Sequence, residues 1–307
     1  MIKGTYHIGF GVTNDERSIN FYQKFLNFGK VRVSIEDVSE GSFGAFVGEG
    51  AHYRWSMLTH NVGDVEFEPV QLLSRNPKPI TENYKWGDIG FNDVCFKVEG
   101  LHKLYDQLRE EGVKLLCPPQ KMIVEDEKWG KEFFYIEDPD GINIKFEEDI
   151  NNSKTKAKVH DYHYLCIGVT DLKASLCFYG EILGYHRVLW NIEGHLEWMD
   201  EVCGERVYGH SVMLGSDFDE HLLQLVKLSG RERNHLFKDK SWGDVGLLEF
   251  CLRVYDLEKT CDDLRKKNVR ILVEPTLATP KLDYAFIAYV ADPDGNYVEF
   301  SFHKKKS

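Results

Sequence analysis

The chain has 307 residues, 42% of them hydrophobic and 13% aromatic, and its 50 Asp and Glu residues exceed its 38 Lys and Arg residues, giving a formal net charge of −12. This length and apolar content allow two ordinary hydrophobic cores. An acidic surface repels phosphate backbones, which excludes nucleic acid as an expected partner. No apolar run approaches the roughly 20 residues that cross a bilayer, and the first residues lack a basic segment followed by an apolar one, so we expect a cytoplasmic protein that does not bind membranes. Seven cysteines without a C-x-x-C pair argue against a disulfide framework and a structural zinc site.

An internal duplication organises the chain. Residues 6–14 match residues 163–171, and each segment is followed by a helix pattern that contains Ser-x-x-Phe-Tyr. Further along, Trp86-Gly-Asp recurs as Trp242-Gly-Asp, and Asp138-Pro-Asp-Gly recurs as Asp292-Pro-Asp-Gly. Several ordered matches at a nearly constant offset predict two similar domains, over 1–149 and 160–307. The polar stretch between them, 150–159, is predicted to be a linker.

Each copy contains a weaker second repeat of a strand, a helix and three more strands. The helix predicted over 14–25 has an Asn cap and an apolar stripe, and a leucine stripe over 101–108 predicts a second helix in the same copy. The second copy repeats both patterns. Each Asp-Pro-Asp-Gly sequence is predicted to form a tight turn that joins the last two strands of its unit. The predicted architecture is α+β, with four βαβββ modules.

These motifs resemble the vicinal oxygen chelate superfamily, which includes glyoxalase I, extradiol dioxygenases and bleomycin resistance proteins. The resemblance covers nearly the whole chain. It is carried by His7-x-x-x-x-Val-x-Asn with the helix after it, and by Asp292-Pro-Asp-Gly-Asn-Tyr-Val-Glu299-Phe. It implies that the modules pair into two half-open β-barrels, and that each barrel surrounds a divalent metal held by residues from the first and last strands of its modules.

Carried over position by position, the resemblance implies two candidate ligands in each module. They are, in chain order, His7 and Gln71, Asp93 and Lys145, Tyr164 and Gln224, and Glu249 and Glu299. If neighbouring modules pair, Lys145 stands where the family has a glutamate, and the second barrel has no imidazole unless His163 slips into register. Neither barrel would then hold the two histidines and one carboxylate that ferrous oxygen activation requires, which disfavours a ring-cleaving dioxygenase.

If module one pairs with module four instead, one barrel holds His7, Gln71, Glu249 and Glu299. This set resembles the nitrogen and oxygen ligands of glyoxalase I and suits one divalent metal, either Zn, Ni, Co, Mn or Fe. The other barrel would lack a metal site and could pair Lys145 with Asp93. The resemblance leaves the choice between the two pairings open.

The resemblance implies a glyoxalase-like lyase or isomerase that binds a small substrate through two vicinal oxygens and stabilises an enediolate on the metal, with Glu299 or Glu249 as the base. An alternative is a non-enzymatic protein that binds an antibiotic or aromatic ligand, and a third possibility is an interaction role for a decayed enzyme. We expect a monomer or a homodimer.

Gly11 stands where glyoxalase I has an arginine for glutathione, although Arg253 fills the matching place in module four. We assign no chemical role to the Trp-Gly-Asp sequences.

Overall fold

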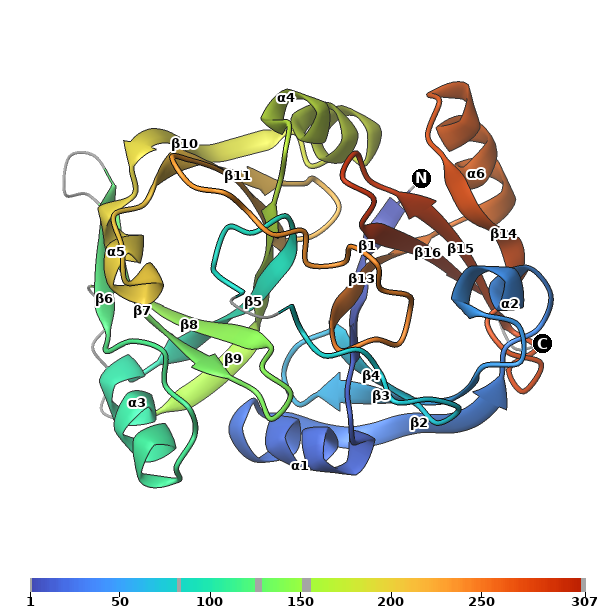
Figure 1. Cartoon of the computed structure of the whole chain (residues 1–307), viewed down its shortest axis with the longest axis horizontal. Coiled ribbons are helices and arrows are strands. Elements are labelled where there is room, and N and C mark those ends of the chain that lie inside the picture. Colours follow the sequence, from blue (N-terminus) through green and yellow to red (C-terminus); the bar gives the residue numbers. More distant parts are fainter. Residues whose placement is uncertain (1, 82–83, 125–128, 151–155, 305–307) are drawn as a thin grey trace.

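Two curled sheets of eight strands each lie side by side, with the helices on their outer faces (Figure 1). The computed structural model describes residues 2–81, 84–124, 129–150 and 156–304. Both ends of the chain lie in the half of the molecule that contains β1 and β16. None of the helices in these ranges is long and apolar enough to span a bilayer.

Four modules share the predicted order of a strand, a helix and three strands. Module one contains β1 (Ile2–Gly11), α1 (Asp15–Phe25), β2 (Phe28–Val38), α2 (Gly41–Val47), β3 (His52–His60) and β4 (Glu66–Leu72). Module two contains β5 (Gly90–Glu99), α3 (Leu101–Glu110), β6 (Gln120–Val124), β7 (Trp129–Glu137) and β8 (Asn143–Asp149). Module three contains β9 (Lys158–Gly168), α4 (Leu172–Ser175), the π-helical continuation η1 (Leu176–Ile182), β10 (Arg187–His195), η2 (Glu197–Met199), α5 (Asp200–Cys203), β11 (Tyr208–Gly215) and β12 (Leu222–Ser229). Module four contains β13 (Gly246–Val254), α6 (Leu257–Lys266), β14 (Ile271–Leu277), β15 (Ala285–Ala291) and β16 (Tyr297–His303).

The two sheets each combine one module from either copy. The first sheet has the order β14-β15-β16-β13-β1-β4-β3-β2, and the second has β10-β11-β12-β9-β5-β8-β7-β6. Antiparallel pairing of β1 with β13 joins modules one and four, and pairing of β5 with β9 joins modules two and three. The predicted four-module, half-barrel fold is confirmed, and module one pairs with module four.

The predicted domain limits therefore describe copies of the sequence, since the two modules within 1–149 lie in different sheets. The predicted linker also overlaps a strand, because β9 begins at Lys158. Part of that linker, 151–155, lies outside the described residues.

The repeated motifs fasten the two sheets to each other. Each Asp-Pro-Asp-Gly sequence forms the predicted turn, between β7 and β8 in module two and between β15 and β16 in module four. Tyr22 of α1 donates a hydrogen bond to Asp138 at 3.1 Å, and Tyr179 of η1 donates to Asp292 at 2.8 Å. The tyrosine of each Ser-x-x-Phe-Tyr motif thus anchors a helix of one sheet to a turn of the other.

Short helical insertions lie where each curled sheet is open. Helix α2 follows β2, one edge strand of the first sheet, and packs against β14, the opposite edge. Its place in module three is taken by η2 and α5, and η2 contacts the edge strand β6. Each insertion therefore covers the gap between the two edges of a half-open barrel, as α2 does at the right of Figure 1.

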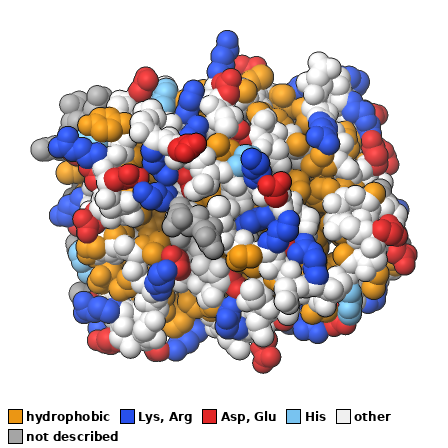
Figure 2. Space-filling model, viewed as in Figure 1, with side chains coloured by type: hydrophobic (Ala, Val, Ile, Leu, Met, Phe, Trp, Pro, Cys, Tyr) orange, Lys and Arg blue, Asp and Glu red, His pale blue; other side chains and the backbone are white. Residues whose placement is uncertain are grey.

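Acidic and basic side chains intermingle on the face of the molecule shown in Figure 2, so the excess of negative charge does not form one continuous patch on that face.

The shared sheets predict that neither half of the chain forms a stable monomer. A fragment of residues 1–152 would expose the inner edges of β1 and β5, which the second half normally covers with β13 and β9. Unpaired edges invite association. We expect each fragment alone to be unfolded or self-associated, and an equimolar mixture with residues 153–307 to recover the circular dichroism and cooperative unfolding of the full chain. A fragment that sediments as a folded monomer would contradict the shared-sheet topology.

Candidate metal centre

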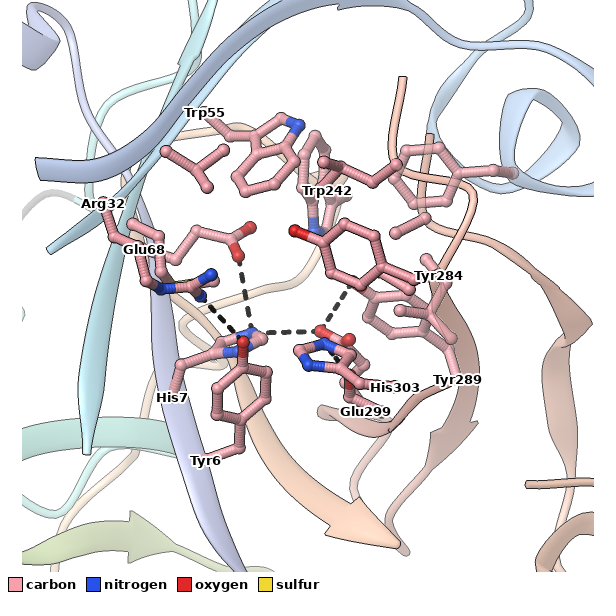
Figure 3. A pocket seen from close by; sticks show the side chains of 18 of the residues that line it. Tyr6, His7, Arg32, Trp55, Glu68, Trp242, Tyr284, Tyr289, Glu299 and His303 are labelled. Atoms are coloured by element: carbon pink, nitrogen blue, oxygen red, sulfur yellow. Dashed lines mark hydrogen bonds and ion pairs between the residues drawn. The ribbon is translucent and has the colours of Figure 1, made fainter. Parts of the chain in front are cut away.

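An imidazole and three carboxylates converge inside the first barrel, and Figure 3 shows His7 with two of the carboxylates, Glu68 and Glu299. His7 Nε2 lies 3.1 Å from Glu299 Oε2, 3.6 Å from Glu249 Oε1 and 3.6 Å from Glu68 Oε2. These residues come from β1, β16, β13 and β4, and all four are at least nine-tenths buried. Strands from both ends of the chain therefore build one cluster.

Strand pairing explains why these side chains meet. The β1–β13 register places His7 opposite Cys251 and Gly9 opposite Glu249. Gly9 is necessary at that point, because a Cβ atom there would lie only 2.5 Å from Glu249 Oε1. Parallel pairing of β13 with β16 sets Cys251 beside Glu299, and alternation along each strand turns these residues toward the barrel interior.

Three of the four predicted ligands lie in this cluster, whereas Gln71 does not. The Gln71 side chain accepts a hydrogen bond from the backbone N–H of Asp15 at 3.1 Å, at the start of α1. Alternation on β4 accounts for the difference: Glu66 and Glu68 face the interior, and Gln71, an odd number of residues further on, faces the helix side. Glu68 occupies the position that the prediction assigned to Gln71.

Aligning the two copies of the repeat would have indicated Glu68 as the inward-facing residue of β4. Val70 and Val226 accept equivalent hydrogen bonds from Val12 and Val169, and they stand in the matching sequences Val70-Gln-Leu and Val226-Lys-Leu. Counting back two residues from each valine aligns Glu68 with Gln224. The candidate in module three was therefore placed correctly relative to the repeat, and the candidate in module one was three residues too late.

Electrostatics in the cluster favour a bound cation. Burial, followed by the charges of Glu249 and Glu299, raises the pKa of Glu68 well above its usual value, and burial also raises the pKa of Glu249. Burial would lower the pKa of His7, but Cys251, Glu299 and Glu68 outweigh it and raise that pKa well above its usual value. Even with a charged imidazole, three ionised carboxylates would leave a buried excess of negative charge, which is costly without a counter-ion.

The donor set fits a divalent metal. Two ligands at about 2.1 Å from a metal lie roughly 3.0–3.4 Å apart when they are adjacent, which is close to the separations of His7 Nε2 from the three carboxylates. Candidate ligand atoms of His7, Glu68 and Glu249 lie within 4.8 Å of one another, as do those of His7, Cys251 and Glu299. His7 Nδ1 and Glu249 Oε1 are buried and have no hydrogen-bond partner among the described residues.

The cluster lies at the bottom of a cavity of about 50 Å³ in the first barrel. Glu68 and Glu299 reach the cavity, and its walls are largely aromatic, with Phe43, Tyr53, Trp55, Trp242, Tyr284 and Tyr289 among the lining residues. Trp242 also donates a hydrogen bond to Glu249 Oε2 at 2.7 Å. The Trp-Gly-Asp sequence, to which we assigned no role, thus supplies a residue of the site.

In the second barrel the matching positions form an internal ion-pair network. Lys145 donates to Tyr164 at 2.6 Å and to Glu147 at 3.3 Å, and His163 Nδ1 lies 2.9 Å from Glu147. The predicted partner of Lys145 was Asp93, and this prediction was wrong: Glu147, two residues along the same strand face, takes the ammonium group. Gln224 donates to Ser211 at 3.0 Å.

Asp93 is left fully buried without a hydrogen-bond partner among the described residues. Burial raises its pKa to about 7, against the opposing charge of Lys145. An acid with a raised native pKa keeps its proton in the folded state while the unfolded chain loses it, so the stability falls as the pH rises from about 4 to 7.

We therefore predict that Asp93→Asn makes the free energy of unfolding less dependent on pH. Between pH 5 and pH 8 the variant should gain roughly 3 kcal/mol relative to the wild type, since each pKa unit corresponds to about 1.4 kcal/mol. Urea unfolding at the two pH values measures this difference, and the same change at an exposed acid, Glu16→Gln, is the control. Parallel losses in the wild type and Asp93→Asn would show that Asp93 is ionised throughout this range.

Comparisons with known proteins agree with this architecture. The family model described as the Glyoxalase/Bleomycin resistance protein/Dioxygenase superfamily matches residues 5–146 and 162–300. A protein of Synechocystis sp. named "Probable lactoylglutathione lyase" is 29% identical over 143 residues, which cover 45% of this chain and 90% of the relative.

Solved structures show the same fold. Glyoxalase I from Zea mays superposes with a TM-score of 0.65 at 18% identity, covering 97% of this chain and 92% of the other. A putative dioxygenase from Bacillus subtilis gives a TM-score of 0.60 at 12% identity, covering 99% of this chain and 86% of the other. Since the family model matches most of both copies, the chain belongs to the Glyoxalase/Bleomycin resistance protein/Dioxygenase superfamily.

Proposed function

We propose that this protein is a metal-dependent lyase or isomerase of the glyoxalase kind, acting on a small substrate with two vicinal oxygens. The observation that carries the proposal is the convergence of His7, Glu68, Glu249 and Glu299 in one buried cluster at the end of a cavity. Both sheets are completed within one chain, so a monomer contains the whole site.

One divalent metal would be held by these four side chains. Imidazole and carboxylate donors suit Zn, Ni, Co, Mn or Fe. A metal held there would supply a Lewis acid for the negative charge that develops on a substrate with vicinal oxygens when a proton leaves the neighbouring carbon. The similarity to a relative named as a lactoylglutathione lyase supports this class of reaction.

Of the two predicted bases, Glu299 is the better placed to move the proton. Glu299 reaches the cavity. Glu249 has no exposed surface, and one of its oxygens accepts two hydrogen bonds, from Trp242 and Tyr289. A general base must come within hydrogen-bond reach of the proton that it removes. We therefore assign proton transfer to Glu299 and a binding role to Glu249.

Beside the cluster, the cavity is also lined by Arg32, which would be the partner of an anionic group on the substrate. Arg32 donates to Tyr6 at 2.9 Å and pairs with Glu66, while the Arg253 guanidinium lies 4.0 Å from the Tyr6 ring centroid. Burial, followed by the charges of Arg253 and Arg32, lowers the pKa of His303 to about 4, so this imidazole is neutral.

The aromatic wall supports a second candidate function, the non-enzymatic binding of an aromatic or antibiotic-like ligand. Aromatic side chains contribute stacking and buried area to such sites. An apolar ligand would leave three buried carboxylates without a counter-ion, which is energetically unfavourable. The metal-dependent function therefore accounts for more of the site. Metal content distinguishes the two.

We predict one equivalent of a divalent metal per chain in protein purified without chelator, and well under 0.2 equivalent in Glu299→Gln, since losing a charged ligand weakens coordination. Elemental analysis by mass spectrometry measures both. Tyr164→Phe is the matched control, because Tyr164 is the second-barrel counterpart of His7, and this variant should retain the full equivalent. A metal-free wild type would favour the binding protein, and two equivalents would contradict a single site.

We also predict exchange of a substrate proton with solvent. The metal-loaded protein should incorporate deuterium next to the carbonyl group of a hydroxyketone or aldehyde adduct in D₂O, followed by ¹H NMR. The first substrates to compare are the hemithioacetal of methylglyoxal with glutathione and small hydroxyketones that carry a carboxylate. Glu299→Gln, reloaded with metal to the same content as the wild type, should slow exchange by at least 100-fold, in line with the contribution of a general base. Equal exchange in the wild type and Glu299→Gln would remove Glu299 from this role.

A further inference from the structure

Glu249 is held at one oxygen and free at the other. Its Oε2 accepts hydrogen bonds from Trp242 Nε1 at 2.7 Å and from Tyr289 OH at 2.8 Å. Its Oε1 has no hydrogen-bond partner among the described residues and lies 3.6 Å from His7 Nε2. The lone pairs of Oε1 therefore remain available at the centre of the cluster.

The Tyr289 hydroxyl group contacts two carboxylates, those of Glu249 and Glu299, at different distances. Its hydroxyl group lies 2.8 Å from Glu249 Oε2 and 3.2 Å from Glu299 Oε2. Burial and the charges of Glu249 and Glu299 raise the pKa of Tyr289 well above its usual value, so the phenol keeps its proton. A phenol has one proton to donate, and the shorter contact assigns it to Glu249.

The second barrel contains the same tryptophan without this hydrogen bond. Trp86 belongs to the matching Trp-Gly-Asp sequence, and Asp93 stands at the position of Glu249. Trp86 is near enough to oppose the rise in the pKa of Asp93 that burial causes. In the part of the chain that the structure describes, however, neither Trp86 Nε1 nor the Asp93 carboxylate has a partner with hydrogen-bond geometry. The indole-to-carboxylate contact therefore reaches full hydrogen-bond geometry in the barrel that contains the acidic cluster and is looser in the second barrel.

Helix α2 packs on both donors. The Phe43 ring lies 5.2 Å from the Trp242 ring, and the Phe46 ring lies 5.1 Å from the Tyr289 ring, measured between centroids. Both distances are typical of favourable aromatic pairs. The insertion that covers the open side of the first barrel therefore also supports the two groups that fix Glu249.

We propose that Trp242 and Tyr289 are positioning residues that hold Glu249 as a one-oxygen metal ligand, and that α2 keeps both of them in place through Phe43 and Phe46. A carboxylate anchored by two donors cannot rotate to offer its second oxygen, so its direction toward the metal is fixed before the metal binds. Hydrogen bonds to a ligand from beyond the metal shell commonly change metal affinity about 10-fold to 100-fold. This inference rests on the proposed metal-dependent function.

The test measures Co²⁺ binding by visible absorption, which reports both affinity and the geometry of the ligands. Tyr289→Phe and Trp242→Phe are each expected to weaken Co²⁺ binding about 10-fold to 100-fold and to alter the absorption bands. Trp86→Phe is the matched control and should change neither quantity. If Trp242→Phe fails to fold, Tyr289→Phe decides, because it removes a single oxygen atom. Wild-type affinity and bands in both site variants would overturn the positioning role.

A measurement without metal separates this inference from the proposed function. In ¹H–¹⁵N NMR spectra of the metal-free protein, Glu249→Gln should shift the indole resonance of Trp242 and leave that of Trp86 unchanged. If the wild type binds no Co²⁺ but the Trp242 resonance shifts, the metal-dependent function fails while the contact stands. If Co²⁺ binds and the Trp242 resonance does not respond to Glu249→Gln, the positioning role fails alone.

The contribution of α2 is tested with Phe43→Leu combined with Phe46→Leu, which keeps the helix apolar but removes the ring contacts. We expect weaker Co²⁺ binding in the same direction as Tyr289→Phe but smaller, because the donors remain and only their support changes. Binding equal to that of the wild type would show that α2 does not act on Glu249.

Discussion

The antiparallel pairing of β1 with β13 is the interaction on which the site depends. It joins the first strand of the chain to the first strand of the last module and sets His7 opposite Cys251. A shift of one residue in this register would turn Glu249 away from the barrel interior, because side chains alternate between the two faces of a strand. The repeated Asp-Pro-Asp-Gly turns and the tyrosines that bind them hold the two sheets in the arrangement that this pairing needs.

Burial of like charges is the second constraint. Glu68, Glu249 and Glu299 are each at least nine-tenths buried around a single imidazole, and burial together with the neighbouring carboxylates raises the pKa values of Glu68 and Glu249. This arrangement of three buried carboxylates around one imidazole occurs in the first barrel. In the other barrel Lys145 stands at the position of Glu299, so that its ammonium group neutralises Glu147 from within the chain. The second barrel thus neutralises its buried acid with a lysine, whereas the acidic cluster of the first barrel surrounds the His7 imidazole.

Much of the fold could be predicted from the sequence because the same motifs recur in order and each recurrence indicates the same module. The two Asp-Pro-Asp-Gly turns, the Ser-x-x-Phe-Tyr helices and the matching first strands define the modules, and they leave open which modules pair. Pairing is decided by contacts between residues some 240 positions apart, such as Gly9 against Glu249, and no local pattern encodes that distance. His7, Glu249 and Glu299 were predicted by position and lie together in the cluster, whereas Gln71 was placed three residues beyond the inward-facing Glu68. Lys145 was assigned to Asp93 because only the family positions were considered, and Glu147 lies outside them.

Trp242 shows why the residues that support a site are harder to read from a sequence than those that occupy it. Both Trp-Gly-Asp sequences predict the same turn before a strand, and both tryptophans are buried. What distinguishes them is the acid that follows, since glutamate at 249 reaches the indole N–H and aspartate at 93, one methylene shorter, does not attain hydrogen-bond geometry. The length of this one side chain therefore contributes to the difference between the two barrels. The second barrel contains internal ion pairs in place of an acidic cluster without loss of the fold, because the strands, turns and helix anchors that both barrels share are independent of the residues inside them.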